Sequence, residues 1–161
     1  MKIRPELKQL NFLNPIHFLA LGFGSGYAPK APGTFGTLAA IPVVYLASLL
    51  PLTGYVALTF IFAVIGCFIC GYTANALKTH DHPAIVWDEV VGLMITFIAI
   101  PLSWQNLLAG FVLFRFFDIL KPWPIKWADQ KVHGGTGIML DDVFAGLMAW
   151  LVLLVLIPYI N

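Results

Sequence analysis

The sequence is poor in charged residues. Only 11% of its 161 residues are Asp, Glu, Lys or Arg, whereas soluble domains carry about 25%. Hydrophobic residues make up 60%, and the mean hydropathy is +0.87. So few charges predict an integral membrane protein, organised as a single domain over residues 1–161. The chain also lacks a basic run, so we expect no nucleic-acid partner.

Cysteine is scarce as well, since the chain contains only Cys67 and Cys70. Two cysteines do not indicate a disulfide-rich exported protein. Their C-x-x-C spacing is found in redox pairs, but those lie in polar, accessible surroundings that stabilise a thiolate. Here the neighbours are Phe, Ile and Val, so we interpret both cysteines as packing residues.

The N-terminus lacks a typical secretory signal. Residues 1–8 are polar, but the apolar stretch 18–23 is short and is interrupted by glycines. A signal peptide needs a longer apolar core and a small-residue cleavage site. We therefore expect no cleavage, and we expect Pro5 to Leu21 to form a short interfacial helix.

Five apolar segments follow along the chain, at residues 38–52, 55–77, 90–102, 107–120 and 143–160. A complete crossing needs about 20 residues, so the first, third and fourth segments are too short by themselves. We expect their helices to continue into the polar flanks. The predicted fold class is all-α: a polytopic membrane protein with about five apolar helices and charged helix ends gathered on one face.

The charged residues are distributed unevenly between the connections. The turns 51–54 and 101–106 and the tail 158–161 contain no Lys, Arg, Asp or Glu. Because Lys and Arg mark cytoplasmic loops, the other ends of the helices are expected to face the cytoplasm. Trp87, Trp123 and Trp127 would mark that interface, and Trp104 would mark the opposite one.

Two adjacent acid pairs, Asp88-Glu89 and Asp141-Asp142, each precede an apolar helix, and Asp118 ends another on the same side. Mg²⁺ prefers such hard oxygen ligands and often shares them with substrate phosphates, whereas Zn²⁺ would favour His and Cys. A second interpretation of Asp141-Asp142 is capping of a helix that follows a flexible Gly/Thr loop, 134–137. Both interpretations stay open at this point.

A glycine-rich stretch, residues 22–37, contains five glycines and two prolines, which argue against a regular helix. Its backbone N–H groups and Lys30 could form a cradle for an oxyanion. The stretch matches neither the P-loop nor G-x-G-x-x-G. The alternative is a linker onto the first apolar helix, capped by Thr34 or Thr37.

Arg115 and Asp118 stand three residues apart on a predicted helix. They either neutralise each other as a local ion pair or place Asp118 on a metal and Arg115 on a phosphate oxygen. Lys121, one turn further, either assists or extends to the interface. His80 and His82 are interpreted as loop residues, with a direct role at the site as the alternative. The remaining polar residues are interpreted as solvated surface: Asp81, Lys126, Asp129 and Lys131.

Four stretches together resemble a known family. They are Gly24-Ser25-Gly26 with Pro29 to Thr37, Asp88 to Gly92, Phe114 to Pro124, and Gly134 to Gly146. In this order they resemble the motifs of the phosphatidylglycerophosphatase A family. Three other signatures of phosphate chemistry are missing: the D-x-D pair of aspartyl phosphatases, the His and Arg motifs of membrane acid phosphatases, and the acidic pattern of CDP-alcohol transferases.

The resemblance implies an all-helical, Mg²⁺-dependent phosphatase of the bacterial inner membrane that converts phosphatidylglycerophosphate to phosphatidylglycerol. We expect the site to face the cytoplasm and the substrate to be a membrane lipid, with the oligomeric state open. The expected metal ligands are Asp88, Glu89, Asp118, Asp141 and Asp142. The expected catalytic residues are Glu89, Asp118, Asp141 and Asp142, and the expected phosphate-binding residues are Lys30, Gly33, Thr34, Arg115 and Lys121.

Two questions remain open at the level of sequence. Attack on phosphorus by water is favoured over attack by an Asp carboxylate, but the residues do not decide between them. A small transporter or channel would need polar residues inside several helices, and such residues are almost absent. A lipid-binding scaffold would leave the adjacent acid pairs unexplained.

Overall fold

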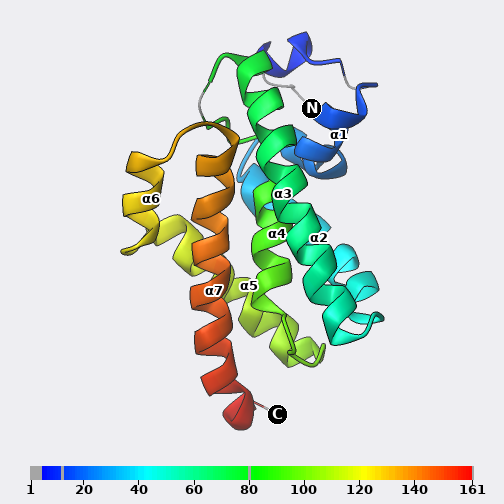
Figure 1. Cartoon of the computed structure of the whole chain (residues 1–161), viewed down its shortest axis with the longest axis vertical. Helices are drawn as coiled ribbons and strands as arrows, with labels where there is room; N and C mark the ends of the chain where they lie inside the picture. Colours follow the sequence, from blue (N-terminus) through cyan, green and yellow to red (C-terminus); the bar gives the residue numbers. More distant parts are fainter. Residues whose placement is uncertain (1–4, 12, 80, 161) are drawn as a thin grey trace.

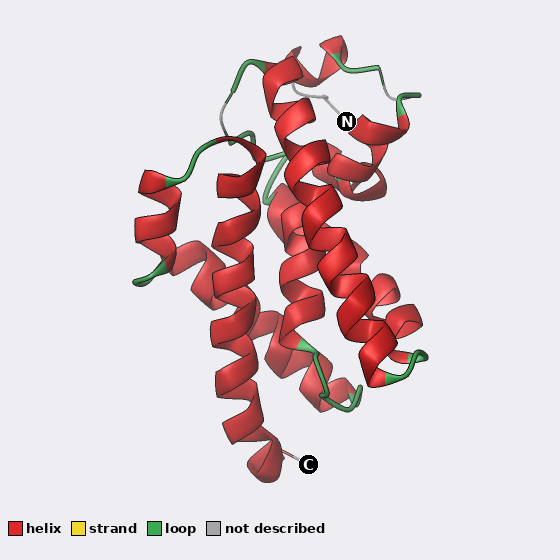
Figure 2. Ribbon diagram, viewed as in Figure 1, coloured by secondary structure: helices red, strands yellow, loops and turns green. Residues whose placement is uncertain are grey.

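A computed structural model describes residues 5–11, 13–79 and 81–160. Within these ranges every regular element is a helix, as the sequence predicts (Figure 2). His80 lies outside the described residues. The elements are η1 (Pro5–Gln9), α1 (Pro15–Ala20), η2 (Gly22–Tyr27), α2 (Pro32–Ser48), α3 (Leu52–Leu77), α4 (Trp87–Thr96), α5 (Trp104–Leu120), α6 (Ile125–Lys131) and α7 (Gly134–Ile160).

Helix α4 is the centre of the molecule. All ten of its residues are buried, and it packs against α2, α3, α5 and α7 (Figure 1). Helices α3 and α5 also pack along α7, and α6 packs on the first part of α7. The N-terminal elements, in place of the one interfacial helix expected over Pro5 to Leu21, form two short pieces, and α1 packs on α3.

Two helices, α3 and α7, are long and apolar enough to cross a membrane. Only 22% of the most apolar stretch of each is buried inside the molecule. A soluble protein rarely exposes so large an apolar surface, so this exposure fits contact with lipid rather than a water-soluble core. The structure thus has two candidate spans, and the five crossings expected from the sequence stay a prediction.

The expectation that the first, third and fourth helices extend into polar flanks is confirmed at the starts of α2, α4 and α5, which all begin before their apolar segments. It is wrong for the end of the third segment, because α4 stops at Thr96. Ala99 adopts a positive φ of 58°, and Pro101 follows. Side chains bond carbonyls at this end: Tyr55 Oη donates to Met94 O at 2.8 Å, and Trp150 Nε1 donates to Ile98 O at 2.8 Å.

Three expectations about loops and interfaces are corrected by the structure. Pro32 to Thr37 is the start of α2 rather than a loop, because Pro32 occupies the first turn, where its missing N–H costs nothing. The Gly/Thr stretch that begins at Gly134 is the first turn of α7. Trp87 does not mark an interface, since it is buried and donates a hydrogen bond from Nε1 to Phe62 O at 3.1 Å.

The contact between α4 and α7 depends on glycine. A Cβ atom at Gly146 would lie 2.4 Å from the carbonyl oxygen of Gly92, which no side chain can relieve by moving. The two backbones therefore approach unusually closely. This approach brings Asp142, four residues before Gly146, next to the acids at the start of α4.

Candidate active site

A cavity of about 260 Å³ lies where α2, α4 and α7 begin and α5 ends. All five acidic residues that the sequence singled out line this cavity, as do Arg115 and Lys121. Its complete lining is Ala31, Pro32, Gly33, Asp81, Pro83, Ile85, Asp88, Glu89, Arg115, Asp118, Lys121, Ile138, Asp141 and Asp142. The structure therefore brings together groups that are more than 100 positions apart in the sequence.

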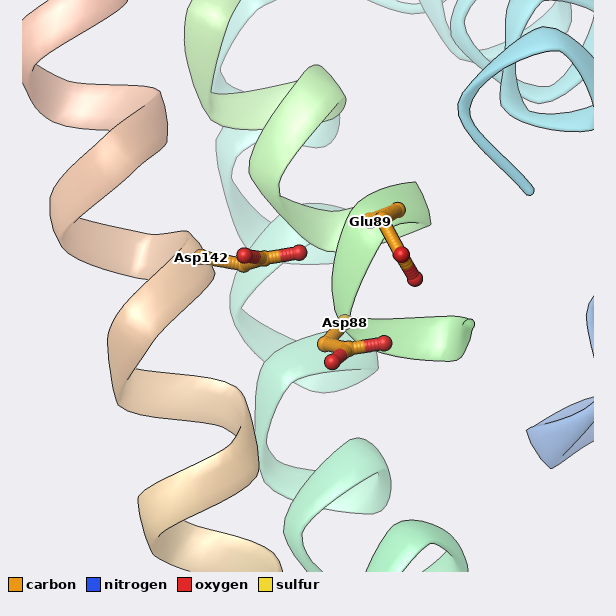
Figure 3. Close-up of side chains that lie close together, drawn as sticks. All are labelled: Asp88, Glu89 and Asp142. Atoms are coloured by element: carbon orange, nitrogen blue, oxygen red, sulfur yellow. The ribbon is translucent and has the colours of Figure 1, made fainter. Parts of the chain in front are cut away.

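Three of the acids form a tight cluster. Asp88, Glu89 and Asp142 each offer one carboxylate oxygen, and these oxygens lie within 4.8 Å of one another (Figure 3). Asp88 and Glu89 come from the first turn of α4, and Asp142 comes from α7. All three residues are buried. Uncompensated carboxylates are costly in such a place, so the cluster needs either protons or a cation.

Carboxylate oxygens without hydrogen-bond partners also indicate that the cluster needs protons or a cation. Four buried carboxylate oxygens have no hydrogen-bond partner among the described residues: Asp88 Oδ1, Glu89 Oε2, Asp141 Oδ1 and Asp142 Oδ2. Buried polar atoms normally have partners, and exceptions concentrate at functional sites. Oxygen-only donors from carboxylates are the set that Mg²⁺ prefers, so the residues present fit this ion.

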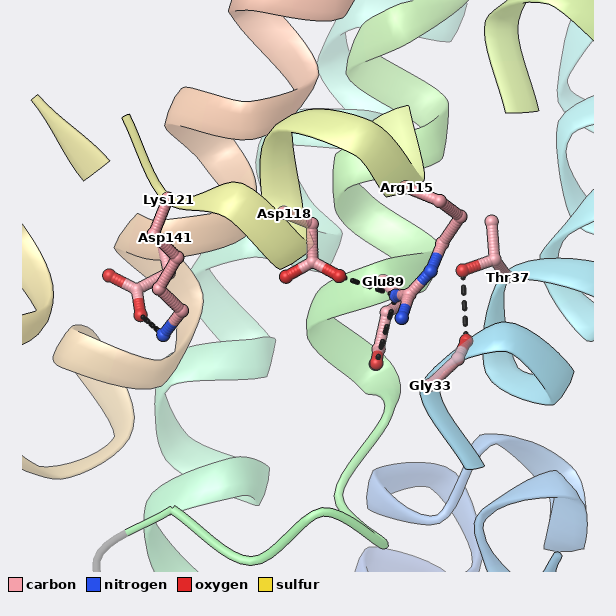
Figure 4. Close-up of polar contacts among 7 residues, drawn as sticks. All are labelled: Gly33, Thr37, Glu89, Arg115, Asp118, Lys121 and Asp141. Atoms are coloured by element: carbon pink, nitrogen blue, oxygen red, sulfur yellow. Dashed lines mark hydrogen bonds and ion pairs between the residues drawn. The ribbon is translucent and has the colours of Figure 1, made fainter. Parts of the chain in front are cut away.

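Arg115 connects α5 to the acid cluster. Its guanidinium contacts the Asp118 carboxylate directly and lies 3.7 Å from Glu89 Oε1 (Figure 4). Thus the ion pair expected from the i, i+3 spacing exists, and Glu89 joins it from another helix. Asp118 is therefore engaged with Arg115 and lies outside the three-acid cluster.

Lys121 forms an ion pair with Asp141, which lies outside the three-acid cluster. Its Nζ donates to Asp141 Oδ2 at 2.7 Å and to Asp129 Oδ1 at 2.8 Å. Lys121 does not extend to the interface, because both bonds draw it toward α6 and α7. Asp129 lies at the surface, as expected, but its exposed carboxylate is also paired with Lys121.

The position of the second acid pair decides against helix capping. Asp141 and Asp142 are the eighth and ninth residues of α7, two turns beyond its start at Gly134. The amides that need a cap lie in the first turn. Asp141-Asp142 therefore face the cavity from the body of a helix.

Helix α2 begins at the cavity, where Ala31, Pro32 and Gly33 line it. No side chain caps this end, so its amides and positive dipole end are directed at the site, which suits an anion. A Cβ at Gly33 would lie 2.4 Å from Glu89 Oε1 and 3.1 Å from both terminal nitrogens of Arg115. Lys30 is exposed in the preceding loop, and neither it nor Thr34 belongs to the described lining.

Burial dominates the electrostatics at the start of α4. It raises the pKa of Asp88 well above its usual range, and the neighbouring Glu89 charge adds to this. Burial, with the charge of Asp142, raises the pKa of Glu89 to about 8. Burial opposes the charge of Lys121, but its bonds to Asp129 and Asp141 outweigh this and raise the lysine pKa.

Sequence reasoning missed two polar residues of this region. Asp81 lines the cavity from the loop before α4, and Asp129 completes the Lys121 network. Neither belongs to a helical i, i+3 or i, i+4 pattern with another site residue, so local spacing gave no sign of them. His82 is buried in the same loop, where Nδ1 accepts from the Ala84 N–H at 3.2 Å.

Most of the chain is similar in sequence to proteins of one known family. A sequence model of the family described as phosphatidylglycerophosphatase A matches residues 18–157. Curated proteins named phosphatidylglycerophosphatase A from Escherichia coli K12 and Haemophilus influenzae are 50% and 52% identical to this chain. The alignments cover 88% of this chain and 83% of the E. coli protein, and 91% of both chains for H. influenzae.

A third relative carries a different name. A Bacteroides thetaiotaomicron protein, named as a candidate phosphatidylinositol-3-phosphatase, is 37% identical over 92% of this chain and 96% of its own length. No solved structure matches the fold.

Proposed function

Since the chain belongs to the phosphatidylglycerophosphatase A family, and is thus a phosphatase, we propose that it hydrolyses phosphatidylglycerophosphate with Mg²⁺ in the cavity described above. The products are phosphatidylglycerol and inorganic phosphate. One observation carries the proposal: four buried carboxylate oxygens without partners face a cavity that also holds an arginine and the start of a helix.

Asp88, Glu89 and Asp142 would hold the metal, because their oxygens form the compact cluster. When bound, Mg²⁺ supplies positive charge that polarises the phosphoryl group and a water molecule. Asp118 and Asp141 are already engaged with Arg115 and Lys121. We therefore narrow the five ligands expected from the sequence to three, with the other two acids acting nearby.

The chain's own cations and amides would bind the phosphate. Arg115 can present its planar donors to two phosphate oxygens, and the uncapped start of α2 at Gly33 adds backbone N–H groups. Both groups are fixed before the reaction, so they stabilise charge that develops on the equatorial oxygens without reorganising. Water attacks phosphorus while Asp118 or Asp141 takes one of its protons, and the bond from phosphorus to the glycerol oxygen breaks. The same proton then passes to the departing glycerol oxygen, which leaves as the alcohol.

The names of the relatives bear on which lipid head group carries the phosphate. The names of the two relatives at about half identity favour glycerol phosphate, while the name of the Bacteroides relative favours inositol 3-phosphate. Both are phosphate monoesters on a membrane lipid, so the same acids and arginine serve either. We propose phosphatidylglycerophosphate as the preferred substrate and place the cavity at the cytoplasmic face of a bacterial inner membrane.

The experiment uses the full chain, purified in detergent, with phosphatidylglycerophosphate in mixed micelles. Phosphate release should need Mg²⁺ and should stop on addition of EDTA. Asp142→Asn should lose more than about 100-fold in turnover, beyond the loss typical of a residue that only supports a ligand. Glu6→Gln, an exposed acid on η1, is the matched control and should behave as the unmodified protein. Folded Asp142→Asn protein with full activity would defeat the proposal.

A further inference from the structure

We infer that the lipid substrate reaches the cavity sideways from the bilayer, with its acyl chains lying in a groove between α2 and α5. This inference rests on the proposed function, because it concerns the hydrocarbon part of the same phosphorylated lipid. The groove is defined by Leu38 and Ile41 on α2 and by Leu108 and Phe111 on α5.

Cavity size is the first argument. About 260 Å³ lies below the roughly 300–1,000 Å³ of pockets that enclose drug-sized ligands. The cavity can enclose a phosphorylated head group but not two acyl chains. Each methylene that leaves hydrocarbon for water costs free energy, so the chains must stay in contact with the bilayer or an apolar surface. The cavity therefore needs an apolar exit that is continuous with the membrane.

Helix arrangement supplies one candidate exit. Around the central α4, α3 and α5 both pack along α7, and α2 and α3 also touch. Over the described residues α2 and α5 touch at most marginally, although each packs on α4. Arg115 lies at the cavity end of this opening, against Gly33 of α2. A phosphate bound there would have its ester oxygen close to the gap between the two helices.

On α5 the gap continues as an apolar stripe. Helix α5 ends at the cavity, so positions before Arg115 lead away from it into the hydrocarbon region. Phe111 and Leu108 stand four and seven residues before Arg115, which places them on the same helix face. Leu108 is 58% exposed, and Phe111 is partly exposed. Arg115, which would bind the phosphate, thus lies at the cavity end of this apolar stripe.

Helix α2 supplies the apolar surface on the other side of the groove. It starts at the cavity and runs away from it, whereas α5 ends there. Thr37 is buried toward the interior, and Gly36 meets Val86 on one side of it. At 100° per residue, Leu38 and Ile41 lie on the other side of Thr37, away from Val86. Leu38 is exposed and Ile41 is half-buried, so this surface is apolar and accessible.

The test narrows the groove with Leu108→Trp and, independently, Leu38→Trp. Both variants and the unmodified protein are assayed on dioleoyl phosphatidylglycerophosphate in vesicles and on its water-soluble dihexanoyl analogue. The matched control is Val64→Trp, an equally exposed apolar position on α3. For the long-chain lipid we expect KM to rise about tenfold with kcat nearly constant, the pattern of lost substrate binding. The short-chain analogue should be cleaved almost normally by every variant.

Equal losses on both substrates, or unchanged KM for the long-chain lipid in both groove variants, would overturn the inference. A second measurement does not depend on catalysis. A phosphatidic acid carrying a photoreactive group in one acyl chain should label residues 38–41 and 108–111, and excess glycerol 3-phosphate should suppress this labelling. Labelling confined to α3, or insensitive to glycerol 3-phosphate, would also overturn it. If the unmodified protein cleaves neither substrate, the proposed function fails and the labelling alone decides the groove.

Discussion

The acidic residues of the cavity have different electrostatic partners, and this separates their roles. Asp142 faces Asp88 and Glu89 and forms no ion pair of its own among the described residues, whereas Asp141, its neighbour in the sequence, is bonded to Lys121. Adjacent positions on a helix point about 100° apart, so two consecutive acids reach different partners. We therefore propose that the charge of Asp142 serves to bind the metal, whereas the charge of Asp141 is paired with Lys121.

This difference leads to a comparison of Asp142→Asn with Asp141→Asn. Asp142→Asn should lower turnover more than about 100-fold, and its residual activity should need a higher Mg²⁺ concentration to reach half its maximum. Asp141→Asn should cost about 10–100-fold, as expected for a residue that orients a site from outside, with little change in Mg²⁺ requirement. Steady-state phosphate release across a Mg²⁺ titration measures both. An equal increase in Mg²⁺ requirement for the two variants would contradict the assignment.

The Lys121 network gives a second prediction at single residues. Lys121→Met removes the ammonium that neutralises Asp141 and Asp129, leaving Asp141, a buried acid, without its partner. We expect activity to fall about 10–100-fold, and Lys121→Arg to restore part of it. Asp129→Asn should have a smaller effect, because Asp129 is more exposed. Lys126→Gln, an exposed lysine on α6, is the control; a loss there equal to that of Lys121→Met would exclude a specific role.

For single residues, the sequence predicted which charged side chains belong to the site better than it predicted which side chains form ion pairs with them. Arg115 and Asp118 follow from helical spacing, and the structure joins them. Asp129 does not, because its approach to Lys121 depends on the path of Lys121 to Pro124 and the packing of α6 on α7. Lys30 was proposed from a loop composition that suits anions, and its role in phosphate binding stays a prediction.

Among the helices, α7 shows why glycine content misled the sequence reading. Gly134 to Gly137 was expected to be a loop, yet it starts a regular helix. A Cβ at Gly135 would lie 1.8 Å from the carbonyl oxygen of Cys67, so glycine is needed there for α3 and α7 to pack closely. Tertiary packing outweighs the weak helix propensity of glycine, and a single sequence does not reveal such a contact.

The close approach of α4 and α7 predicts the effect of Gly146→Ala. Its added Cβ meets the backbone of Gly92, so the helices must separate, which typically costs about 1–3 kcal/mol. Separation also draws Asp142 away from Asp88 and Glu89. Thermal unfolding in detergent should show a lower midpoint, and the Mg²⁺ requirement should rise. Leu147→Ala, at the exposed neighbouring position, should leave the Mg²⁺ requirement unchanged, and an identical response of the two variants would contradict this account.

For the molecule as a whole, hydropathy predicted an all-helical protein but not its central helix. The apolar run 90–102 has the composition of a lipid-facing segment, yet α4 is enclosed by four other helices. Lipid and protein interior are both apolar, so composition cannot distinguish them. The helix of ten residues is about 15 Å long, half the hydrocarbon thickness, and is suited to placing acids inside the molecule rather than to crossing.

The orientation in the membrane can be tested on the whole molecule. The turn after α2 and the connection after α4 lie at the end opposite the N-terminal elements (Figure 1). In a background without Cys67 and Cys70, Thr53→Cys should react with a membrane-impermeant thiol reagent added to intact cells. Lys30→Cys, exposed near the cavity, should react only after the cells are opened. Labelling of position 30 in intact cells would reverse the proposed orientation.

The stability of the metal-free protein should fall as the pH rises from 4.5 to about 8. Burial raises the pKa of Glu89 to about 8 and that of Asp88 well above its usual range. Between the ordinary carboxyl pKa, near 4.5, and 8, the folded state therefore binds more protons than the unfolded state, so stability must fall as pH rises. Mg²⁺ binds the deprotonated acids, so it should raise the unfolding midpoint most above pH 8 and least near pH 5.5. Thermal unfolding with EDTA and with Mg²⁺ across this range measures both trends, and Asp142→Asn should reduce the Mg²⁺ effect. A midpoint that rises with pH in EDTA would show that Arg115 compensates these carboxylates more than burial opposes their charge, which would remove the electrostatic reason for a further cation at the cluster.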